Sequence, residues 1–162
     1  MTGNPDRLGS KILFLRPTHI VPMAKKNAPD TSRILADAVI AGMQEVKGHE
    51  IICLDLRKIP HAIADFFVIC HGNSHTQVDA AARSIERETE LKLNESPWHK
   101  EGLNNSEWVL LDYGDVVAHV FYREARSFYG LEDLWADAIT ERIEEETVTD
   151  TNNSLNVRKS RK

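Results

Sequence analysis

Residues 108–135 read W-V-L-L-D-Y-G-D-V-V-A-H-V-F-Y-R-E-A-R-S-F-Y-G-L-E-D-L-W, and this stretch decides the fold. Its first half predicts a β-hairpin, because residues 108–111 and 116–121 are dense in β-branched and aromatic side chains. Gly114 lies between the two runs and can take the positive φ that hairpin turns require. Both runs are apolar at consecutive positions, which is typical of strands covered on both faces in the middle of an α/β sheet.

The second half of the stretch predicts two short helical segments. Residues 123–129 can form the first, and Gly130 is placed to cap its C-terminus. Leu131, Leu134 and Trp135 recur at i, i+3 and i+4, so they predict one apolar stripe on the second segment. Glu132 and Asp133 lie off that stripe.

Large aromatic side chains and carboxylates occur together throughout this stretch. The aromatic residues are Trp108, Phe128, Tyr129 and Trp135, and the carboxylates are Asp112, Asp115, Glu124 and Glu132. A surface that combines an aromatic anchor with negative charge suits a basic protein partner. The alternative for any one of these residues is that the aromatic side chain belongs to the core and the acid to a solvated rim.

The composition favours one domain with tails. The chain has 162 residues, of which 41% are hydrophobic, and this is enough to bury a core. The net charge of −5 argues against non-specific binding to nucleic acid, although contact with a basic protein beside nucleic acid stays open. No apolar run approaches the length of a membrane span. Cys53 and Cys70 lie inside apolar runs, so we expect two small buried side chains in a reducing compartment, the cytoplasm.

Three segments are predicted along the chain. Residues 1–29 are expected to be a flexible N-terminal extension, in which Met23 resembles a second start. Residues 30–146 form the domain. Residues 147–162 are polar and end in V-R-K-S-R-K, and they lack the apolar side chains that offset the entropy of ordering. We therefore predict a disordered C-terminal tail.

The predicted order of elements is α-β-β-α-β-β-α. This alternation indicates a single α/β domain in which helices flank a mixed β-sheet. The run at residues 66–71 is apolar throughout and is expected to be a central strand. The predicted elements in chain order are a helix capped by Asp30 or Thr31, strands at residues 50–56 and 66–71, a helix capped by Asn73 or Ser74, the hairpin, and final helical turns that residues 139–146 extend.

A metal or nucleotide site is not favoured by the polar motifs. His71 and His75 have the spacing H-x3-H, but His71 ends a strand and no third ligand is adjacent. Gly72-Asn73-Ser74 at a helix start resembles the Gly-Ser turn of nucleotidyltransferases and is a plausible anion cradle. Those enzymes also need closely set carboxylates for two metal ions, whereas Asp112 and Asp115 are spaced D-x-x-D across a turn. A structural helix cap is the favoured role of this turn.

His119 is the one polar residue in the run V-V-A-H-V-F. A general base needs a nucleophile or substrate within hydrogen-bond reach, and no serine elbow or reactive cysteine motif lies nearby. We expect a satisfied histidine at the edge of the sheet rather than a catalyst. The sequence therefore predicts no catalytic residue, no metal site and no cofactor.

The hairpin run followed by R-x-F-Y-G-L-E-D-L-W resembles the ribosomal silencing factor family, also called Iojap-like. The earlier run D-F-F-V-I-C-H-G-N-S-H-T-Q-V is similar to the family's second block, and the strand I-I-C-L-D-L also fits. The resemblance covers roughly Asp30 to Ala138. It implies the family's α/β domain, which is distantly like nucleotidyltransferases but without their activity.

The same resemblance implies a function and a contact region. Family members dock on the large ribosomal subunit, on its ribosomal protein L-fourteen, and block joining with the small subunit when nutrients are scarce. The Trp and Tyr of the family's contact region fall on Trp108 and Tyr129 here. Leu131, which opens the L-E-D-L-W run, joins the candidate contact residues. Asp112, Asp115 and Glu132 are added as carboxylates that can face a basic ribosomal protein.

Three further readings stay open. A metal-dependent nucleotidyl or phosphoryl transferase would use Gly72, Ser74, Asp112 and Asp115. The second reading is a factor that assists assembly of the large subunit without silencing. A homodimer is also compatible with the resemblance, because an exposed sheet edge would permit it.

Overall fold

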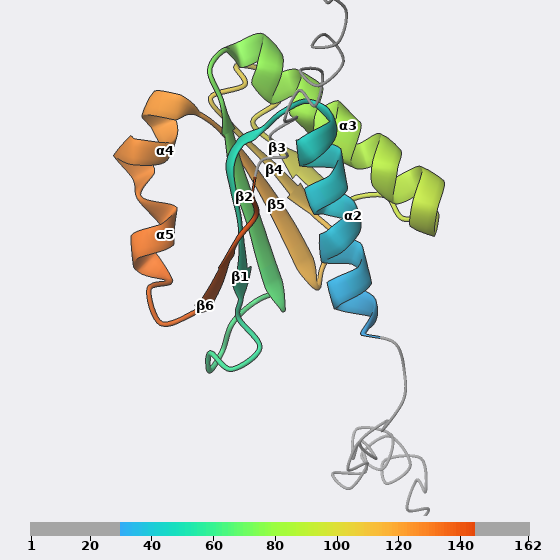
Figure 1. Ribbon diagram of the computed structural model, residues 1–162, viewed down its shortest axis with the longest axis vertical. Helices are drawn as coiled ribbons and strands as arrows, with labels where there is room; N and C mark the ends of the chain where they lie inside the picture. The colour runs from blue at the N-terminus through green and yellow to red at the C-terminus, as the bar shows by residue number, and fades with distance from the viewer. Residues whose placement is uncertain (1–29, 145–162) are drawn as a thin grey trace, which may run out of the picture.

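The structure, a computed structural model, describes residues 30–144 as one mixed sheet with helices on both faces (Figure 1). The predictions for the N-terminal extension and for the C-terminal tail lie outside the described residues. The elements are α2 (Thr31–Glu45), β1 (His49–Asp55), β2 (Phe66–Gly72), α3 (His75–Leu93), β3 (His99–Glu101), β4 (Trp108–Asp112), β5 (Val116–Tyr122), α4 (Arg123–Tyr129), α5 (Leu131–Leu134) and β6 (Ile139–Arg142).

The sheet has six strands in the order β3-β4-β5-β2-β1-β6. The two central strands, β2 and β5, run parallel, and the other neighbours pair antiparallel. All seven residues of β2 are buried, and β5 is buried up to its last residue. The sheet is therefore mixed, as predicted, with its most apolar runs in the middle, where both faces are covered.

Strand β4 differs from the prediction that both hairpin strands are covered on both faces. Its burial alternates, with Val109 and Leu111 fully buried and the residues between them only partly so. The reason is its place in the sheet, because only the short strand β3 lies beyond it. Trp108, Leu110 and Asp112 thus share the partly open face of β4.

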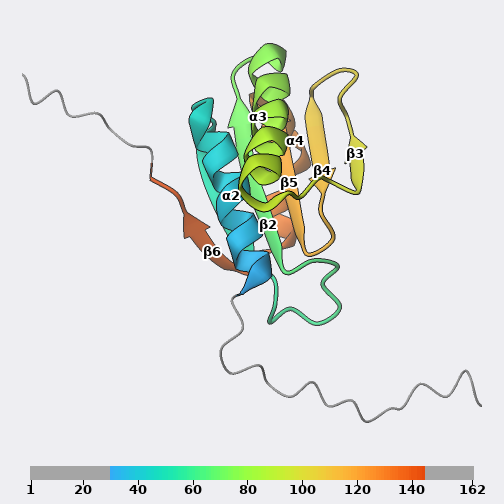
Figure 2. The same ribbon diagram turned by 90° about the vertical axis from the view of Figure 1, so that its right-hand side faces the viewer.

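The first face of the sheet is covered by the two long helices α2 and α3, which lie side by side in Figures 1 and 2. Asp30 caps α2 by accepting a hydrogen bond from the Arg33 N–H, and Ser74 caps α3 in the same way. The two helices approach closely at Gly42, where a Cβ would lie 2.5 Å from the Ile85 Cα. Only glycine permits that approach.

The second face is covered by the short helices α4 and α5, on the opposite side of the sheet from α2 and α3 (Figure 1). Gly130 has φ +55° and ends α4, as predicted, with its N–H donating to the Arg126 carbonyl. Leu131 and Trp135 pack against the second core cluster, whereas Leu134 is 76% exposed. The predicted apolar stripe is therefore wrong at Leu134.

Two edge strands were not predicted. β3 has the sequence H-K-E, which carries no strand signal, and all three of its residues are exposed. The prediction that residues 139–146 extend the last helix is wrong, because Ile139–Arg142 form β6 and pair antiparallel with β1. The guanidinium of Arg33 holds Glu141 through two hydrogen bonds, of 2.6 and 3.3 Å. Pairing with a neighbouring strand overrides the weak local preference of this segment.

Candidate functional site

Trp108 opens β4 on the second face of the sheet and is half-buried. Its indole stacks on Phe121 of the neighbouring strand, with ring centroids 4.8 Å apart. The indole Nε1–H donates a 3.2 Å hydrogen bond to Nδ1 of His119. The ring is thus held from two sides while part of it stays open to solvent.

Tyr129 ends α4 and lies against Trp108. The two ring centroids are 4.9 Å apart, and Tyr129 is 48% exposed. Phe128 stands perpendicular to Tyr129 at 5.1 Å and is 82% exposed. We call Trp108, Phe128 and Tyr129 the aromatic surface. Exposed aromatic rings in mutual contact are typical of sites that anchor another protein.

Arg126 fixes the helix that carries two of these rings. It is buried, and its Nε donates a 2.6 Å hydrogen bond to Glu132. Its Nη1 donates to the Glu50 carbonyl at 2.9 Å and lies 3.0 Å from Nδ1 of His71. Burial, and secondly the Arg126 charge, lower the pKa of His71. Glu132, next to Leu131, is therefore held by Arg126, which in turn ties α4 to the start of β1.

Asp112 and Asp115 lie at the other end of the hairpin. Asp112 pairs with Val117, whereas Trp108 pairs with Phe121, which puts about 13 Å of strand between the two ends. The Asp112 carboxylate accepts a 2.7 Å hydrogen bond from the Gly114 N–H. Asp115 is exposed at the turn. The six candidate contact residues thus form two groups, one around the aromatic surface and one at the turn.

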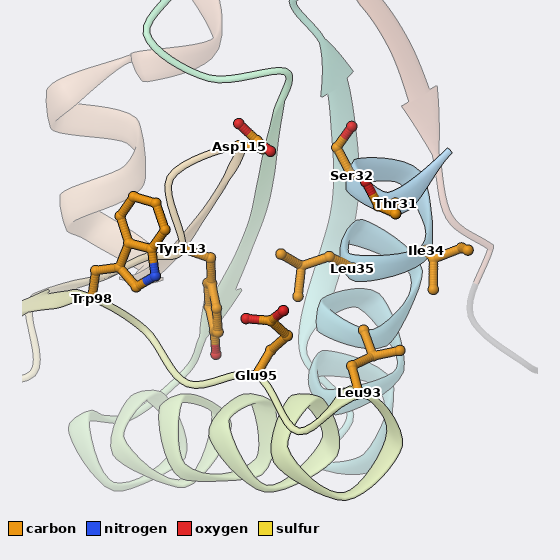
Figure 3. Close-up of a pocket in the computed structure, with 9 residues that line it drawn as sticks. All are labelled: Thr31, Ser32, Ile34, Leu35, Leu93, Glu95, Trp98, Tyr113 and Asp115. Carbon is orange, nitrogen blue, oxygen red and sulfur yellow. The ribbon is translucent and has the colours of Figure 1, made fainter. Parts of the chain in front are cut away.

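Trp98 is a feature of the turn that sequence reasoning did not single out. It is 80% exposed, and its ring covers Gly114, where a Cβ would lie 2.8 Å from the indole. It lines a pocket of about 340 Å³ together with Leu35, Tyr113, Glu95 and Asp115, among others (Figure 3). A tryptophan within the polar connection of residues 93–107 was the only sequence signal for this site.

The prediction that His119 lies at the edge of the sheet is wrong. It lies on the central strand β5 and is 3% exposed. Burial lowers the pKa of His119 to about 4, so the ring is neutral at physiological pH. Its Nδ1 accepts from Trp108, while Nε2 has no hydrogen-bond partner among residues 30–144. The predicted satisfied histidine is therefore only half satisfied.

The transferase constellation is not assembled. Gly72 ends β2 beside Tyr122, whereas Asp115 precedes Val116 at the start of β5, about 20 Å away along parallel strands. Ser74 caps α3 by accepting from the Gln77 N–H, which is the structural role that the sequence favoured. In the described part of the chain, no cluster of three His, Cys, Asp or Glu side chains could hold a metal ion.

The two cysteines are buried and free, as predicted for small core side chains. Burial raises the pKa of the Cys53 thiol to about 11 and that of Cys70 to about 12, so neither is a reactive thiolate. Within the described ranges, no helix is long and apolar enough to cross a membrane.

The fold is that of a small α/β domain with an exposed aromatic surface. Comparison with known families identifies the family of this domain. The family described as "Ribosomal silencing factor during starvation" matches residues 29–162, and the chain belongs to this family. The resemblance that the sequence motifs indicated is confirmed.

Individual relatives agree with this assignment. The chain is 39% identical over 110 residues to the ribosomal silencing factor of Halalkalibacterium halodurans, covering 68% of this chain and 92% of that protein. It is 43% identical over 101 residues to the Bacillus subtilis factor, covering 60% and 81%. It is also 30% identical over 116 residues to the chloroplastic Iojap protein of Zea mays, covering 68% and 48%. The names of the two bacterial relatives describe regulatory factors rather than enzymes.

Solved structures share the fold of this chain. A crystal structure from Bacillus halodurans matches with a TM-score of 0.58 and 33% identity, covering 69% of this chain and 98% of that one. A crystal structure from Chromobacterium violaceum matches with a TM-score of 0.61 and 28% identity, covering 74% and 95%. The predicted α/β class, a mixed sheet flanked by helices, is confirmed.

Proposed function

We propose that this protein is a non-catalytic repressor of translation, which binds the large ribosomal subunit in the cytoplasm when nutrients are limiting. Its partner on the subunit is ribosomal protein L-fourteen, and the bound protein blocks joining with the small subunit by occupying space. Membership of the ribosomal silencing factor family supports the class of function. The observation that carries the contact is the aromatic surface, where Tyr129 lies on Trp108 beside Phe128, which is 82% exposed.

The geometry suits such a contact for a physical reason. Phe128 and Tyr129 offer large rigid rings with few rotatable bonds, so a partner can cover them with little loss of conformational entropy. Arg126 clamps the helix that carries them, and the sheet supports Trp108 from below. An anchor that is already in place before binding costs less to dock than one that must be ordered.

The carboxylates of the turn contribute a second, weaker contact in this proposal. Asp115 is exposed, and its carboxylate has no hydrogen bond or ion pair with another described residue, so it is open to a basic protein. Charges at the rim of an interface raise the association rate and the salt sensitivity more than the affinity. Glu132 contributes indirectly, because Arg126 already holds it.

A subunit-joining assay tests the proposal. Purified small and large subunits are mixed with increasing amounts of the protein and separated on a sucrose gradient. The joined-ribosome peak should fall while the protein sediments with free large subunits. An unchanged peak at saturating protein would contradict silencing, and immature large subunits in a deletion strain with normal joining would favour the assembly reading.

Site-specific crosslinking tests the partner. Phe128 is replaced by a photoreactive benzoyl-phenylalanine, which adds little strain because the side chain is 82% exposed. The same group at position 98, also solvated, is the matched control. Irradiation with large subunits should join position 128 to ribosomal protein L-fourteen more strongly than position 98. Crosslinking of position 128 to a different ribosomal protein would refute the proposed partner.

A further inference from the structure

His119 occupies a position where an apolar side chain would be expected. It lies on β5, the buried central strand, between Val117 and Phe121 on the second face of the sheet. Its ring centroid is 4.8 Å from that of Phe67 and 6.3 Å from that of Phe121. Burying an imidazole among such rings removes both of its nitrogens from water, which is costly unless each finds a partner.

Only one of the two nitrogens has a partner. Nδ1 accepts the 3.2 Å hydrogen bond from the Trp108 indole, and Nε2 has none within the described part of the chain. One ordinary hydrogen bond does not offset the desolvation of a buried donor that is left unpaired. A leucine of similar volume would be expected to stabilise this position, so stability does not account for the histidine.

What the histidine does supply is an acceptor for Trp108. An indole has one polar atom, the Nε1–H, and it can only donate. The stacking contact with Phe121 tolerates rotation of the indole within its plane, whereas the hydrogen bond to His119 selects one orientation. In that orientation the indole ring lies 4.9 Å from the Tyr129 ring, measured between centroids, with the two planes tilted by 46°.

We propose that His119 is a positioning residue, which holds the Trp108 indole in the orientation that the aromatic surface needs for binding. This inference rests on the proposed function, since it concerns the same surface. The acceptor is available throughout the physiological range, because burial keeps the pKa of His119 at about 4 and the ring stays neutral. Without the acceptor, the indole N–H must turn toward water, and binding would have to restore its orientation.

Two substitutions separate positioning from packing. His119→Leu keeps the volume and removes the acceptor. His119→Asn keeps an acceptor, because the amide oxygen can take the place of Nδ1. If His119 only fills space, Leu is the better replacement. If it positions Trp108, Asn is the better one, and the two readings therefore predict opposite rankings.

The first measurement uses the full-length free protein and needs no ribosome. The indole N–H of Trp108 is followed by NMR hydrogen exchange and assigned with Trp108→Phe. We expect slow exchange in the wild type and in His119→Asn, and exchange at least about tenfold faster in His119→Leu, because the hydrogen bond is lost. Equal protection in the Leu variant would overturn the proposal whatever the ribosome does.

The second measurement is the affinity for large subunits, alongside the midpoint of thermal unfolding. We expect His119→Leu to bind about tenfold more weakly without a lower midpoint, and His119→Asn to bind within about threefold of the wild type. Wild-type binding by His119→Leu would overturn positioning and leave the silencing function intact. If the wild type itself does not bind, the proposed function fails, and the exchange rates still decide whether His119 orients Trp108.

A double-mutant cycle tests whether His119 and Trp108 act through the same hydrogen bond. Trp108→Phe removes the donor and leaves the histidine in place. Because the two residues act through one hydrogen bond, the double variant should bind no more weakly than the weaker single variant. If the losses in binding free energy of the two single variants add up in the double variant, the two residues act independently, and this would overturn the proposal.

Discussion

The two faces of the sheet are covered very differently. On the first face, α2 and α3 bury the apolar residues of the sheet almost completely, with Val109, Leu111 and Ala118 at 0% exposure. On the second face, the central sheet residues are equally buried, with Ile69 and Phe121 at 0% exposure. The shorter helices α4 and α5, however, expose large side chains of their own, with Phe128 at 82% and Leu134 at 76%, and they leave Trp108 of β4 partly open. Strands β1, β2, β4 and β5 each contribute alternate residues to the two faces.

This difference separates stability from function. The first face has the close packing and full burial that give most of the free energy of folding. The second face holds a partly covered apolar surface, and such a surface lowers the solubility of a protein unless a partner covers it. Substitutions on the first face should therefore change the free energy of unfolding, and substitutions at the open end of the second face should change binding.

The largest expected effect breaks the first face. Gly42→Val places side-chain atoms where even a Cβ would lie 2.5 Å from the Ile85 Cα, so α2 and α3 must separate. We expect a loss of at least about 3 kcal/mol in the free energy of unfolding, measured by urea denaturation. The exposed neighbour Gln44→Ala on the same helix is the control and should change it by less than about 0.5 kcal/mol. Equal stabilities for the two variants would contradict the close approach.

A change of pH probes the second face through His119. Its pKa is lowered by burial to about 4, so the folded state resists protonation more than the unfolded state, whose pKa is about 6.5. The free energy of unfolding is therefore not reduced by His119 above pH 6.5. It falls by about 3 kcal/mol as the pH falls from 6.5 toward 4, because only the unfolded state takes up the proton there.

Urea denaturation at pH 7 and pH 4.5 measures this dependence. His119→Asn should remove most of the difference between the two pH values, and the remainder includes His71, whose pKa is lowered in the same direction. A variant with the same pH dependence as the wild type would show that the loss arises elsewhere.

Release of the α4 clamp should have a smaller effect on stability and a clear effect on binding. Arg126→Met removes the donor to the Glu50 carbonyl and leaves Glu132 without its partner. We expect a loss of about 2 kcal/mol by urea denaturation and weaker binding to large subunits. The matched control is Arg123→Met, an exposed arginine of the same helix. If both variants behave alike, the clamp does not hold the aromatic surface.

The smallest expected effect concerns the turn. Asp115→Asn removes one exposed charge without changing the fold, so we expect about a twofold loss of affinity at low salt and none at high salt. Glu45→Gln on α2 removes an equally exposed charge from the first face and is the control. A salt-independent change, or an equal change in the control, would exclude a role for the turn.

Much of the fold could be predicted from local sequence signals. The hairpin around Gly114, the caps Asp30 and Ser74, and the end of α4 at Gly130 all follow from residue chemistry within a few positions. The edge strands could not be predicted, because β3 and β6 are short, exposed and polar, and exist through pairing with β4 and β1.

The candidate site was harder to predict than the fold. Trp108 and Tyr129, 21 positions apart, do meet, and the family motif pointed to both. The separation of Trp108 from Asp112 follows from the rise of the predicted strand, whereas residue spacing alone does not show that Tyr129 lies beside Trp108. The role of Glu132 depends on Arg126 and on the Glu50 carbonyl from a distant strand, and no local pattern indicates that contact.

The most direct test compares two exposed aromatic residues at opposite ends of the hairpin. Tyr129→Ala alters the aromatic surface, while Trp98→Ala removes a larger and more exposed ring at the turn. Binding of each variant to purified large subunits is measured by sedimentation. We expect a loss of affinity of about tenfold or more for Tyr129→Ala and of less than about twofold for Trp98→Ala. Equal losses, or a greater loss for Trp98→Ala, would contradict it.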